Sequence, residues 1–511
     1  MTEQSRNDQY EFMCVKIDDS IPMNSDSTTK PRNLNTHRLL TASAVIGAIV
    51  MLFAFLRSNG FWIDELYTLH SIRLGWREMV MERLHRGHFP GYFTLVRLWY
   101  SLWPEAMFEV ALRSMSAAFY LAAVGSFWLL ARRTLTQPAA LLALALFACN
   151  GIALRQASEA RMYTVVLLLA VWMVRAAYEL MQPGAARRWS VLMVILTMLG
   201  FAVSATVGVL VGSLLAVSLW YRRENPRLTR TMALALVLGL LVFIPGAILH
   251  VQTADRLGMS SSKPLIFAAH PVALLFGVQY WDDYYRSDTR LLVLLIIGIV
   301  AVVGVVALLW RHRAALSPAL RRLAIVAALP YVLIMLSYPL VELFELDIMG
   351  PPRYLLTLMP VAVLLAGWAL ARLPRPVVVH GVLTVFLLFS AWTILTVQVE
   401  KFRDRMHDYL ALHYQPGDGL VVTPHEIADG VELYVPGATV DAAISRWIMD
   451  RNELRTLLAP LADRPRVWVV WYRGNDSPLL EVGSEMWGPF ESNRPEKEMG
   501  SLRVFKFEPP R

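Results

Sequence analysis

The sequence predicts an α-helical polytopic membrane protein of about eleven transmembrane helices, with a small extramembrane α/β domain at the C-terminal end. Of the 511 residues, 56% are hydrophobic and 17% are charged, and the mean hydropathy of +0.46 exceeds that of ordinary soluble chains. Apolar runs such as 39–56, 291–310 and 377–397 have the length at which a helix crosses a hydrocarbon core roughly 30 Å thick. Hydropathy falls after about residue 400, where short β-like runs alternate with helix-like stretches.

The apolar runs define the expected membrane spans. Their bounds are 38–57, 110–131, 138–155, 161–180, 189–203, 205–221, 230–250, 290–310, 322–340, 354–371 and 376–397. The segment 88–103 is also apolar, but it has Arg97 near its middle and is rich in the tyrosine and tryptophan side chains that favour the membrane interface. We therefore expect a helix that lies on the membrane surface there.

Arginines recur in every second connection between these spans. They are Arg132 and Arg133, then Arg187 and Arg188, then Arg222, Arg223, Arg227 and Arg230, then Arg311, Arg313, Arg321 and Arg322, and finally Arg372 and Arg375. Short cytoplasmic loops are enriched in arginine and lysine, so this pattern places the N-terminus in the cytoplasm and the C-terminal domain outside. If 88–103 crossed the membrane, all of these arginines would lie outside.

Three parts of the chain follow. Residues 1–37 are polar and are expected to form a disordered cytoplasmic tail. Residues 38–397 form the membrane domain, with 58–109 as a first external loop containing interfacial helices. Residues 398–511 form the soluble external α/β domain. The localisation that follows is a multi-pass protein of a bacterial inner membrane, with its site on the periplasmic side.

Composition and missing motifs narrow the function. Cys14 and Cys149 lie in the tail and in an apolar run, which argues against a disulfide framework or a thiolate metal site. The net charge of +8 comes from arginines at the ends of apolar runs, a pattern that does not indicate nucleic-acid binding. The sequence has no P-loop, no G-x-G-x-x-G, no H-E-x-x-H and no D-x-D motif. We expect no cofactor, and a substrate that is dissolved in the bilayer.

Several ionisable residues fall on the outer side. They are Asp64, Glu65, His88, Arg113, Arg155, Glu159, Arg161 and Arg353. Ionisable groups near hydrocarbon are costly, so their gathering on one face suggests a water-filled functional cavity. Simpler explanations stay open: acids favoured at a helix N-terminus for Asp64 and Glu65, an i,i+4 pair for Arg155 and Glu159, and interface anchoring for the other arginines.

Five segments, taken in order, resemble a known family. They are FWIDELYTLH (Phe61 to His70), HFPGYFTLVRLW (His88 to Trp99), EVALR (Glu109 to Arg113), ASEARMY (Ala157 to Tyr163) and PPRYLLTLMP (Pro351 to Pro360). The chain resembles membrane glycosyltransferases of the C-type fold, which include protein O-mannosyltransferases and bacterial aminoarabinose and galacturonic acid transferases. The resemblance covers about residues 38–397.

The resemblance implies transfer of a sugar from a polyprenyl-phosphate carrier to a lipid, glycan or protein acceptor on the outer face. It implies that Asp64 is the catalytic base, with Glu65 beside it, and that Arg113 contacts the donor phosphate. The remaining residues expected to bind donor phosphate and sugar are His88, Arg161, Tyr163, Arg353 and Tyr354.

The chemistry of such a donor agrees with these residues. Polyprenyl phosphate is a stable anion when it leaves, so one carboxylate to accept the acceptor's proton, with cations to hold the phosphate, is sufficient. Direct attack by the acceptor implies inversion at the anomeric carbon. Asp64 and Glu65 diverge by roughly 100° on a helix, so we expect Glu65 to order the loop or pair with an arginine, and we expect no metal site.

Two departures from the family matter for the substrate. The common His-Pro-Pro is His88-Phe89-Pro90 here, and no lysine occurs between Lys30 and Lys263. Aminoarabinose transferases use a lysine of the first loop, so its absence argues against aminoarabinose as the sugar. Two rival functions are a lipid-linked sugar transporter, which would need no base, and an O-antigen polymerase or ligase, which usually has its key residues in late loops. The sequence names neither the sugar nor the acceptor.

Overall fold

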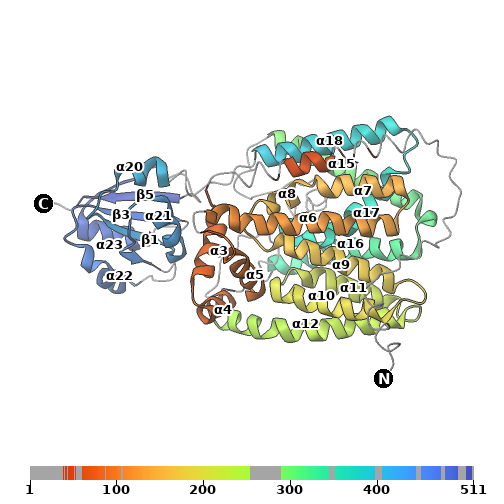
Figure 1. Cartoon of the computed structure of the whole chain (residues 1–511), viewed down its shortest axis with the longest axis horizontal. Coiled ribbons are helices and arrows are strands. Elements are labelled where there is room, and N and C mark those ends of the chain that lie inside the picture. The colour runs from red at the N-terminus through yellow and green to blue at the C-terminus, as the bar shows by residue number, and fades with distance from the viewer. Residues whose placement is uncertain are drawn as a thin grey trace, which may run out of the picture.

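A computed structural model describes residues 60–253 except 87, 105 and 106, and then 289–343, 352–396, 406–444, 450–472, 478–492 and 502–508, together with 38, 41, 42, 44–50 and 52. The tail expected over 1–37 lies outside these residues. Figure 1 shows a bundle of long helices at one end of the molecule and a small sheet domain at the other. Short helices of the first loop lie between them.

The helices of the first loop and the bundle follow one another along the chain. They are α3 (Ile63–Arg73), α4 (Trp76–His85), α5 (Pro90–Tyr100), α6 (Phe108–Thr134), α7 (Gln137–Ala148), α8 (Gly151–Ala157), α9 (Tyr163–Leu180), α10 (Arg187–Val203), α11 (Val207–Trp220), α12 (Pro226–Thr253), α15 (Thr289–Arg311), η3 (Arg313–Ala315), α16 (Pro318–Leu343), η4 (Pro352–Leu358), α17 (Met359–Leu370) and α18 (Pro376–Thr396). Each expected span from 110–131 onward coincides with one of these helices or with a consecutive pair.

By length and composition, four helices among the described residues could cross a membrane: Phe108–Thr134, Tyr163–Leu180, Pro226–Leu249 and Arg353–Leu370. A fifth is possible if α7 and α8, which meet at a 52° bend, form one span. The total of eleven spans stays a prediction. Asn150 begins α8 at this bend, where its side chain accepts a hydrogen bond from the Ala153 N–H at 3.2 Å.

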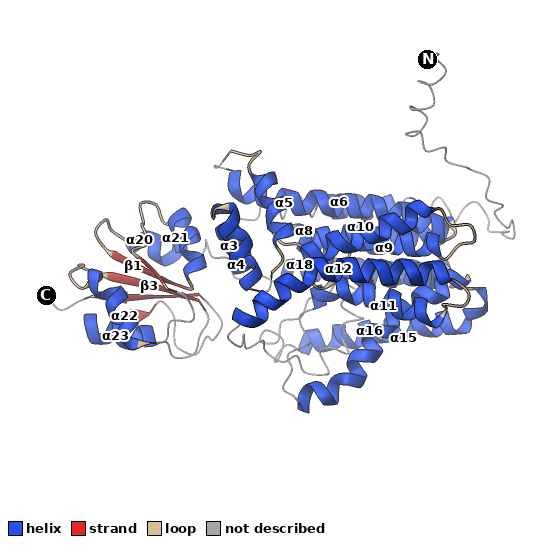
Figure 2. Ribbon diagram, turned by 90° about the horizontal axis from the view of Figure 1, so that it is seen from below, coloured by secondary structure: helices blue, strands red, loops and turns tan. Residues whose placement is uncertain are grey.

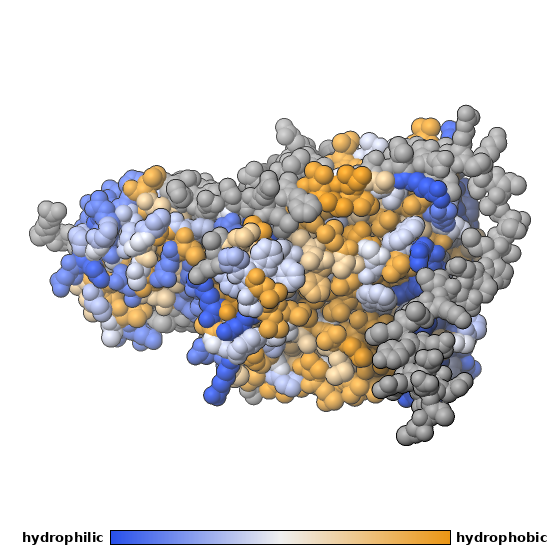
Figure 3. Space-filling model, viewed as in Figure 1, coloured by the Kyte–Doolittle hydropathy of each residue, from blue (hydrophilic) through white to orange (hydrophobic). Residues whose placement is uncertain are grey.

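The outward surface of the bundle is apolar. Leu241 on α12 and Val300 on α15 are 64% and 65% exposed. Many other apolar residues of these two helices are also exposed, with smaller exposed fractions. Figure 3 shows this apolar surface as a broad band over the bundle, with hydrophilic residues gathered over the sheet domain and at the opposite end. An apolar surface of this extent is expected for a domain surrounded by lipid.

Close helix contacts inside the bundle depend on small residues. A Cβ atom at Gly367 on α17 would lie 2.7 Å from the backbone nitrogen of Ala143 on α7, so only glycine permits this approach. The partly described segment 38–52 also packs on α7, because the Thr41 hydroxyl donates to the Leu141 carbonyl at 3.1 Å.

Helix α5 lies in the segment 88–103 that was expected on the membrane surface. With 11 residues it is about 16 Å long, too short to cross the hydrocarbon core. It packs against α6 and α10. A Cβ atom at Gly91 would lie 2.5 Å from the Ala202 carbonyl oxygen at the end of α10. In Figure 2, α3 and α4 lie at the end of the bundle that faces the sheet domain.

The C-terminal part forms a five-stranded sheet with helices on both faces. Its elements are η5 (Met406–Leu410), α20 (Ala411–His413), β1 (Gly419–Thr423), η6 (His425–Ile427), α21 (Ala428–Tyr434), β2 (Ala442–Ala443), α22 (Arg451–Leu458), η7 (Ala459–Leu461), β3 (Val467–Tyr472), α23 (Pro478–Trp487), β4 (Phe490–Ser492) and β5 (Leu502–Phe507). The strand order is β2-β1-β3-β5-β4, with β1 parallel to β2 and β3, and β5 antiparallel to β3 and β4. Every residue of β1 is buried, which fits a strand covered on both faces.

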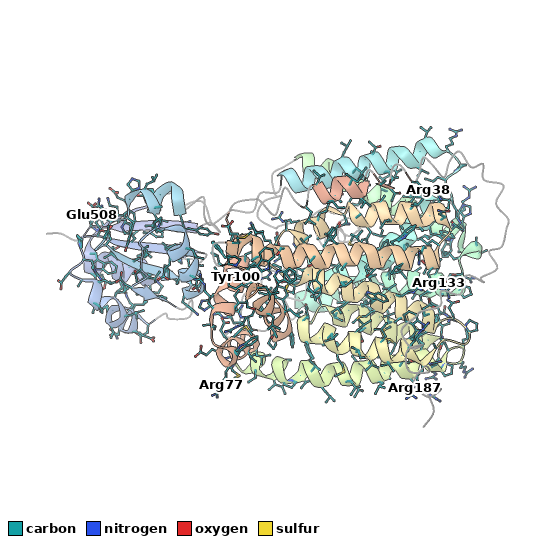
Figure 4. The ribbon with its side chains drawn as sticks, in the orientation of Figure 1. Arg38, Arg77, Tyr100, Arg133, Arg187 and Glu508 are labelled. Carbon is teal, nitrogen blue, oxygen red and sulfur yellow. The ribbon has the colours of Figure 1, made fainter. Side chains whose placement is uncertain are left out.

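Arginines mark the end of the bundle that lies away from the sheet domain. Figure 4 places Arg38, Arg133 and Arg187 at that end, with Arg77 and Tyr100 at the end nearer the sheet domain. Helix α5 and the sheet domain therefore lie on the side opposite Arg133 and Arg187.

Candidate active site

Helix α3 begins with the two acids that the sequence singled out. Trp62 is the N-cap residue, and its N–H donates to the Glu65 carboxylate at 3.2 Å, which closes the first turn. Acidic residues in the first turn are favoured by the helix dipole. The helical period turns Asp64 and Glu65 in different directions, so the two carboxylates have separate environments.

Glu65 forms a buried ion pair with Arg113. The Nε and Nη2 atoms of Arg113 donate to the two oxygens of Glu65 at 2.8 and 2.7 Å, and the side chains are 3% and 1% exposed. Glu65 also accepts from the Ala160 N–H at 3.0 Å, and Arg113 donates to the Gly60 carbonyl at 2.6 Å. These bonds satisfy a charge pair that would otherwise be costly to bury. Glu65 therefore has the arginine partner expected from the sequence.

Asp64 lies beside two other arginines. Its Oδ2 atom is 3.4 Å from the Nη2 atom of Arg161 and 3.7 Å from that of Arg353. The Asp64 side chain is 19% exposed, whereas those of Arg161 and Arg353 are 8% and 6% exposed. Two guanidinium groups against one carboxylate leave a formal charge of +1, and the accessible group of the three is the carboxylate.

The loop that bears Arg161 is fixed against α3 and α6. The Ala160 carbonyl accepts from the Thr68 hydroxyl of α3 at 3.0 Å, and the Arg161 carbonyl accepts from the Ser116 hydroxyl of α6 at 3.3 Å. Arg161 Nη1 also donates to the Asp64 carbonyl at 3.3 Å. The Arg161 Nε atom is buried and has no acceptor among the described residues, so it is a donor available to an anion.

Aromatic rings surround the guanidinium of Arg353 in η4. Its Cζ atom lies 5.7 Å from the ring of Trp62, 5.6 Å from that of Tyr163 and 5.9 Å from that of Tyr354. Tyr163 and Tyr354 also stack on each other, with centroids 6.2 Å apart. Cation–π contacts with these three rings favour this position of the guanidinium.

A second buried pair lies behind the arginines. Arg155 Nε donates to Glu159 at 2.9 Å, and Gln156 donates to the other oxygen at 3.1 Å. Burial raises the pKa of Glu159, although the positive charges of Arg155 and Arg353 oppose this shift. Arg155 and Glu159 are thus an i,i+4 pair, the simpler of the two explanations that the sequence left open.

The structure thus brings together Asp64, Arg161, Tyr163, Arg353 and Tyr354 among the predicted site residues. Glu65 and Arg113 lie behind them as a buried pair. His88 lies two residues before the first residue of α5, half-buried, with its ring 6.3 Å from that of Phe93. No group of three or more potential metal ligands occurs among the described residues.

Sequence reasoning missed several contributing residues. Trp62 stood inside the quoted motif, next but one to Asp64, and its aromatic ring could have been chosen from that position. The Ala160 backbone N–H had no side-chain signal. The Tyr434 hydroxyl donates to Glu109 at 2.8 Å although the two residues are 325 positions apart, and no local sequence pattern predicts this contact.

No family model and no curated protein matches the chain. Solved structures do. ArnT from Cupriavidus metallidurans in the apo state is 14% identical with a TM-score of 0.58, and ArnT bound to undecaprenyl phosphate is 16% identical with a TM-score of 0.56. Each match covers 91% of this chain and 97% of the ArnT chain.

An oligosaccharyltransferase from Archaeoglobus fulgidus, in complex with Zn and sulfate, is 11% identical with a TM-score of 0.52. This match covers 90% of the present chain and 72% of the oligosaccharyltransferase. At these identities the likeness concerns the fold. The chain therefore has the fold of ArnT, the C-type glycosyltransferase fold that its sequence resemblance predicted.

Proposed function

We propose that this chain transfers a sugar from a polyprenyl-phosphate donor to a lipid, glycan or protein acceptor at the outer face of the membrane. The observation that supports this most directly is the partly exposed carboxylate of Asp64 beside the buried guanidinium groups of Arg161 and Arg353. A structurally similar ArnT binds undecaprenyl phosphate, an anionic lipid of the kind that such a pair of arginines suits.

In the proposed reaction Asp64 is the general base. The acceptor hydroxyl attacks the anomeric carbon while its proton passes to the Asp64 carboxylate. The bond between the anomeric carbon and the phosphate oxygen breaks, and polyprenyl phosphate leaves with the electron pair. One direct displacement inverts the anomeric configuration. The leaving phosphate gains negative charge as the bond breaks, so fixed donors beside it favour the transition state.

Arg161 and Arg353 are the proposed phosphate donors. Their combined charge exceeds that of Asp64, and the Arg161 Nε–H has no protein acceptor among the described residues. Arg113 was expected in this role from the sequence, but its guanidinium is bound to Glu65 and Gly60. We assign Arg113 and Glu65 to positioning. His88, Tyr163 and Tyr354 stay proposed contacts of the donor.

The proposed setting is a bacterial inner membrane, with the site and the C-terminal domain on the periplasmic side. The partners are membrane lipids, the donor and the acceptor, with neither nucleic acid nor a metal ion required. The missing first-loop lysine argues against aminoarabinose as the sugar.

The test compares Asp64→Asn with the wild type. Asparagine keeps the shape but cannot accept the proton, so release of undecaprenyl phosphate from undecaprenyl-phosphate sugars should fall by about 10²–10⁴-fold. In cells, mass spectrometry of envelope glycans should reveal a product that disappears with the gene, returns with the wild type and does not return with Asp64→Asn. Glu78→Gln, on an exposed turn of α4, is the matched control and should restore the product. Full activity of purified Asp64→Asn would exclude Asp64 as the base.

A lipid-linked sugar transporter is the second candidate. The 52° bend between α7 and α8, and the break between α10 and α11, resemble the discontinuous helices of transporters. A transporter would move the intact donor and release no free undecaprenyl phosphate. The same purified assay therefore separates the two functions.

A further inference from the structure

The C-terminal sheet domain makes direct contact with the helix that bears Asp64. Helix α21 packs on α3 (Figure 1). A Cβ atom at Gly430 of α21 would lie 2.5 Å from the Cδ2 atom of Leu66, so the two helices approach as closely as a glycine permits. Asp429 accepts from His70 at 2.7 Å and from Arg73 at 3.0 Å, both on α3.

Tyr434, the last residue of α21, forms hydrogen bonds with the segment that precedes α3 and with α6. Its hydroxyl accepts from the Phe61 N–H at 2.9 Å and donates to Glu109 at 2.8 Å. The other oxygen of Glu109 accepts from the Gly60 N–H at 3.2 Å. One tyrosine hydroxyl thus joins the segment before Asp64 to the first turn of α6.

The hydrogen bonds continue from this point to both sides of the site. The Gly60 carbonyl accepts from Arg113, Arg113 binds Glu65, and Glu65 accepts from the Ala160 N–H. Ala160 immediately precedes Arg161. Aromatic packing follows the same route, because the Phe108 ring lies 5.6 Å from that of Phe61 and 6.3 Å from that of Tyr434.

We propose that Tyr434 is a positioning residue, through which the C-terminal domain sets the place of Asp64 relative to Arg161 and Arg353. The proposal rests on the transferase function above. The Asp64 carboxylate lies 3.4 and 3.7 Å from its two arginines, so a small shift of the first turn of α3 changes both distances. Misplacement of a reacting group by about 1 Å can cost as much as 10²-fold in rate.

The experiment uses the full chain in detergent with Tyr434→Phe, which removes only the hydroxyl. Loss of one hydrogen-bonding group should lower kcat about three- to tenfold and leave the KM for the undecaprenyl-phosphate sugar unchanged. Amide hydrogen exchange over 60–66 should become about three- to tenfold faster. Tyr409→Phe is the matched control, because Tyr409 packs on Trp468 in the same domain, with ring centroids 5.9 Å apart, and should change neither readout.

Gly430→Val is the second variant, because its side chain would clash with the Leu66 side chain of α3. It should lower kcat in the same direction as Tyr434→Phe. Wild-type kcat and wild-type exchange in Tyr434→Phe would overturn the proposal, whatever Gly430→Val does. If the wild type releases no undecaprenyl phosphate while Tyr434→Phe still speeds exchange over 60–66, the transferase function fails and the positioning of α3 by Tyr434 stands.

Discussion

Arg161 and Arg353 both face the partly exposed carboxylate of Asp64 from buried positions. We expect Arg161→Lys and Arg353→Lys to lower kcat/KM for the polyprenyl-phosphate sugar by about 10- to 100-fold, although charge is kept. Lysine offers a point charge in place of a planar fork, and a lost charge-assisted hydrogen bond costs about 1.5–3 kcal/mol. The measurement is release of undecaprenyl phosphate by purified protein.

Arg175→Lys is the control for these two variants. Arg175 pairs with Glu179 at 2.9 Å on α9, so its replacement should leave kcat/KM unchanged. If Arg161→Lys and Arg353→Lys both keep wild-type kcat/KM, the two residues serve as interface anchors, for which lysine is an adequate substitute.

For the buried pair of Glu65 and Arg113, we predict an effect on the stability of the fold. Glu65→Gln leaves the Arg113 guanidinium buried with no counter-charge from residue 65, and should destabilise the protein by about 3–5 kcal/mol. The measurement is the Tm of the detergent-purified protein. Glu485→Gln, in an exposed pair on the sheet domain, should change the Tm little. A Tm of Glu65→Gln equal to that of the wild type would show that the pair does not stabilise the fold.

At the residue scale, the sequence could identify those candidate site residues that stand close together in one short motif. Asp64 and Glu65 stand together in one motif, and Arg161 and Tyr163 in another, so sequence alone could select them. Which arginine faces which acid could not be predicted, because it depends on the side of α3 that each carboxylate occupies and on the bend before α8. The sequence therefore favoured Arg113, and the structure places Arg161 and Arg353 at Asp64.

At the scale of elements, the contact between α3 and α21 should respond to acid. Burial acts to raise the pKa of Asp429, but hydrogen bonds from His70 and Arg73 outweigh it and lower the pKa below the ordinary 3.8. A depressed carboxylate pKa contributes stability above the unfolded-state value, and this contribution is lost as the pH falls through the folded-state value. At neutral pH, Asp429→Asn should therefore lower the Tm.

The difference in Tm between wild type and Asp429→Asn should shrink as the pH falls below 3.8 and vanish once Asp429 is protonated in the folded state. Asp450→Asn, which also changes an acid of the sheet domain but caps α22 instead, controls for general effects of acid. A difference that grows as the pH falls would contradict the assignment.

The existence of each long helix could be predicted, because a long apolar run in a membrane protein is compatible with few structures other than a helix. The residues at which each helix begins and ends could not be predicted. Helix α6 extends over Phe108–Thr134 against an expected 110–131, and α12 begins at Pro226 against an expected 230. The added residues include Glu109, Arg132, Arg133 and Arg227 and lie beyond the apolar run, so hydropathy does not detect them. The bend between α7 and α8 depends on the cap at Asn150, which a count of apolar residues ignores.

At the scale of the whole molecule, the contact of the sheet domain with α3 joins residues more than 300 positions apart. The bonds from Tyr434 to Phe61 and to Glu109 span 373 and 325 residues. No motif in the sequence indicates that Tyr434 contacts Phe61 or Glu109. The sequence predicts a separate soluble domain over 398–511. In the folded chain this domain contacts α3, the helix that bears Asp64, and composition alone does not indicate that contact.

The orientation of the molecule gives the last prediction. Arg38, Arg133 and Arg187 lie at the end of the bundle away from the sheet domain (Figure 4), and arginine-rich short loops stay in the cytoplasm. Reporter fusions after Arg133 and after Arg511 should therefore report opposite sides of the membrane, cytoplasmic and periplasmic respectively. A fusion after Arg188 should agree with the one after Arg133, because α7, α8 and α9 return the chain to the same end.

Single-cysteine labelling at Arg77 in the full chain is the control against artefacts of truncation, and it should give the periplasmic result. The decisive comparison for 88–103 is between Arg77 and Arg133, because this segment precedes both Arg133 and Arg511 and cannot change whether those two agree. If Arg77 and Arg133 fall on one side, 88–103 crosses the membrane although α5 has only 11 residues. Asp64 and Arg161 would then be on opposite faces, which their separation of 3.4 Å does not allow. The proposed site and the predicted orientation therefore depend on each other.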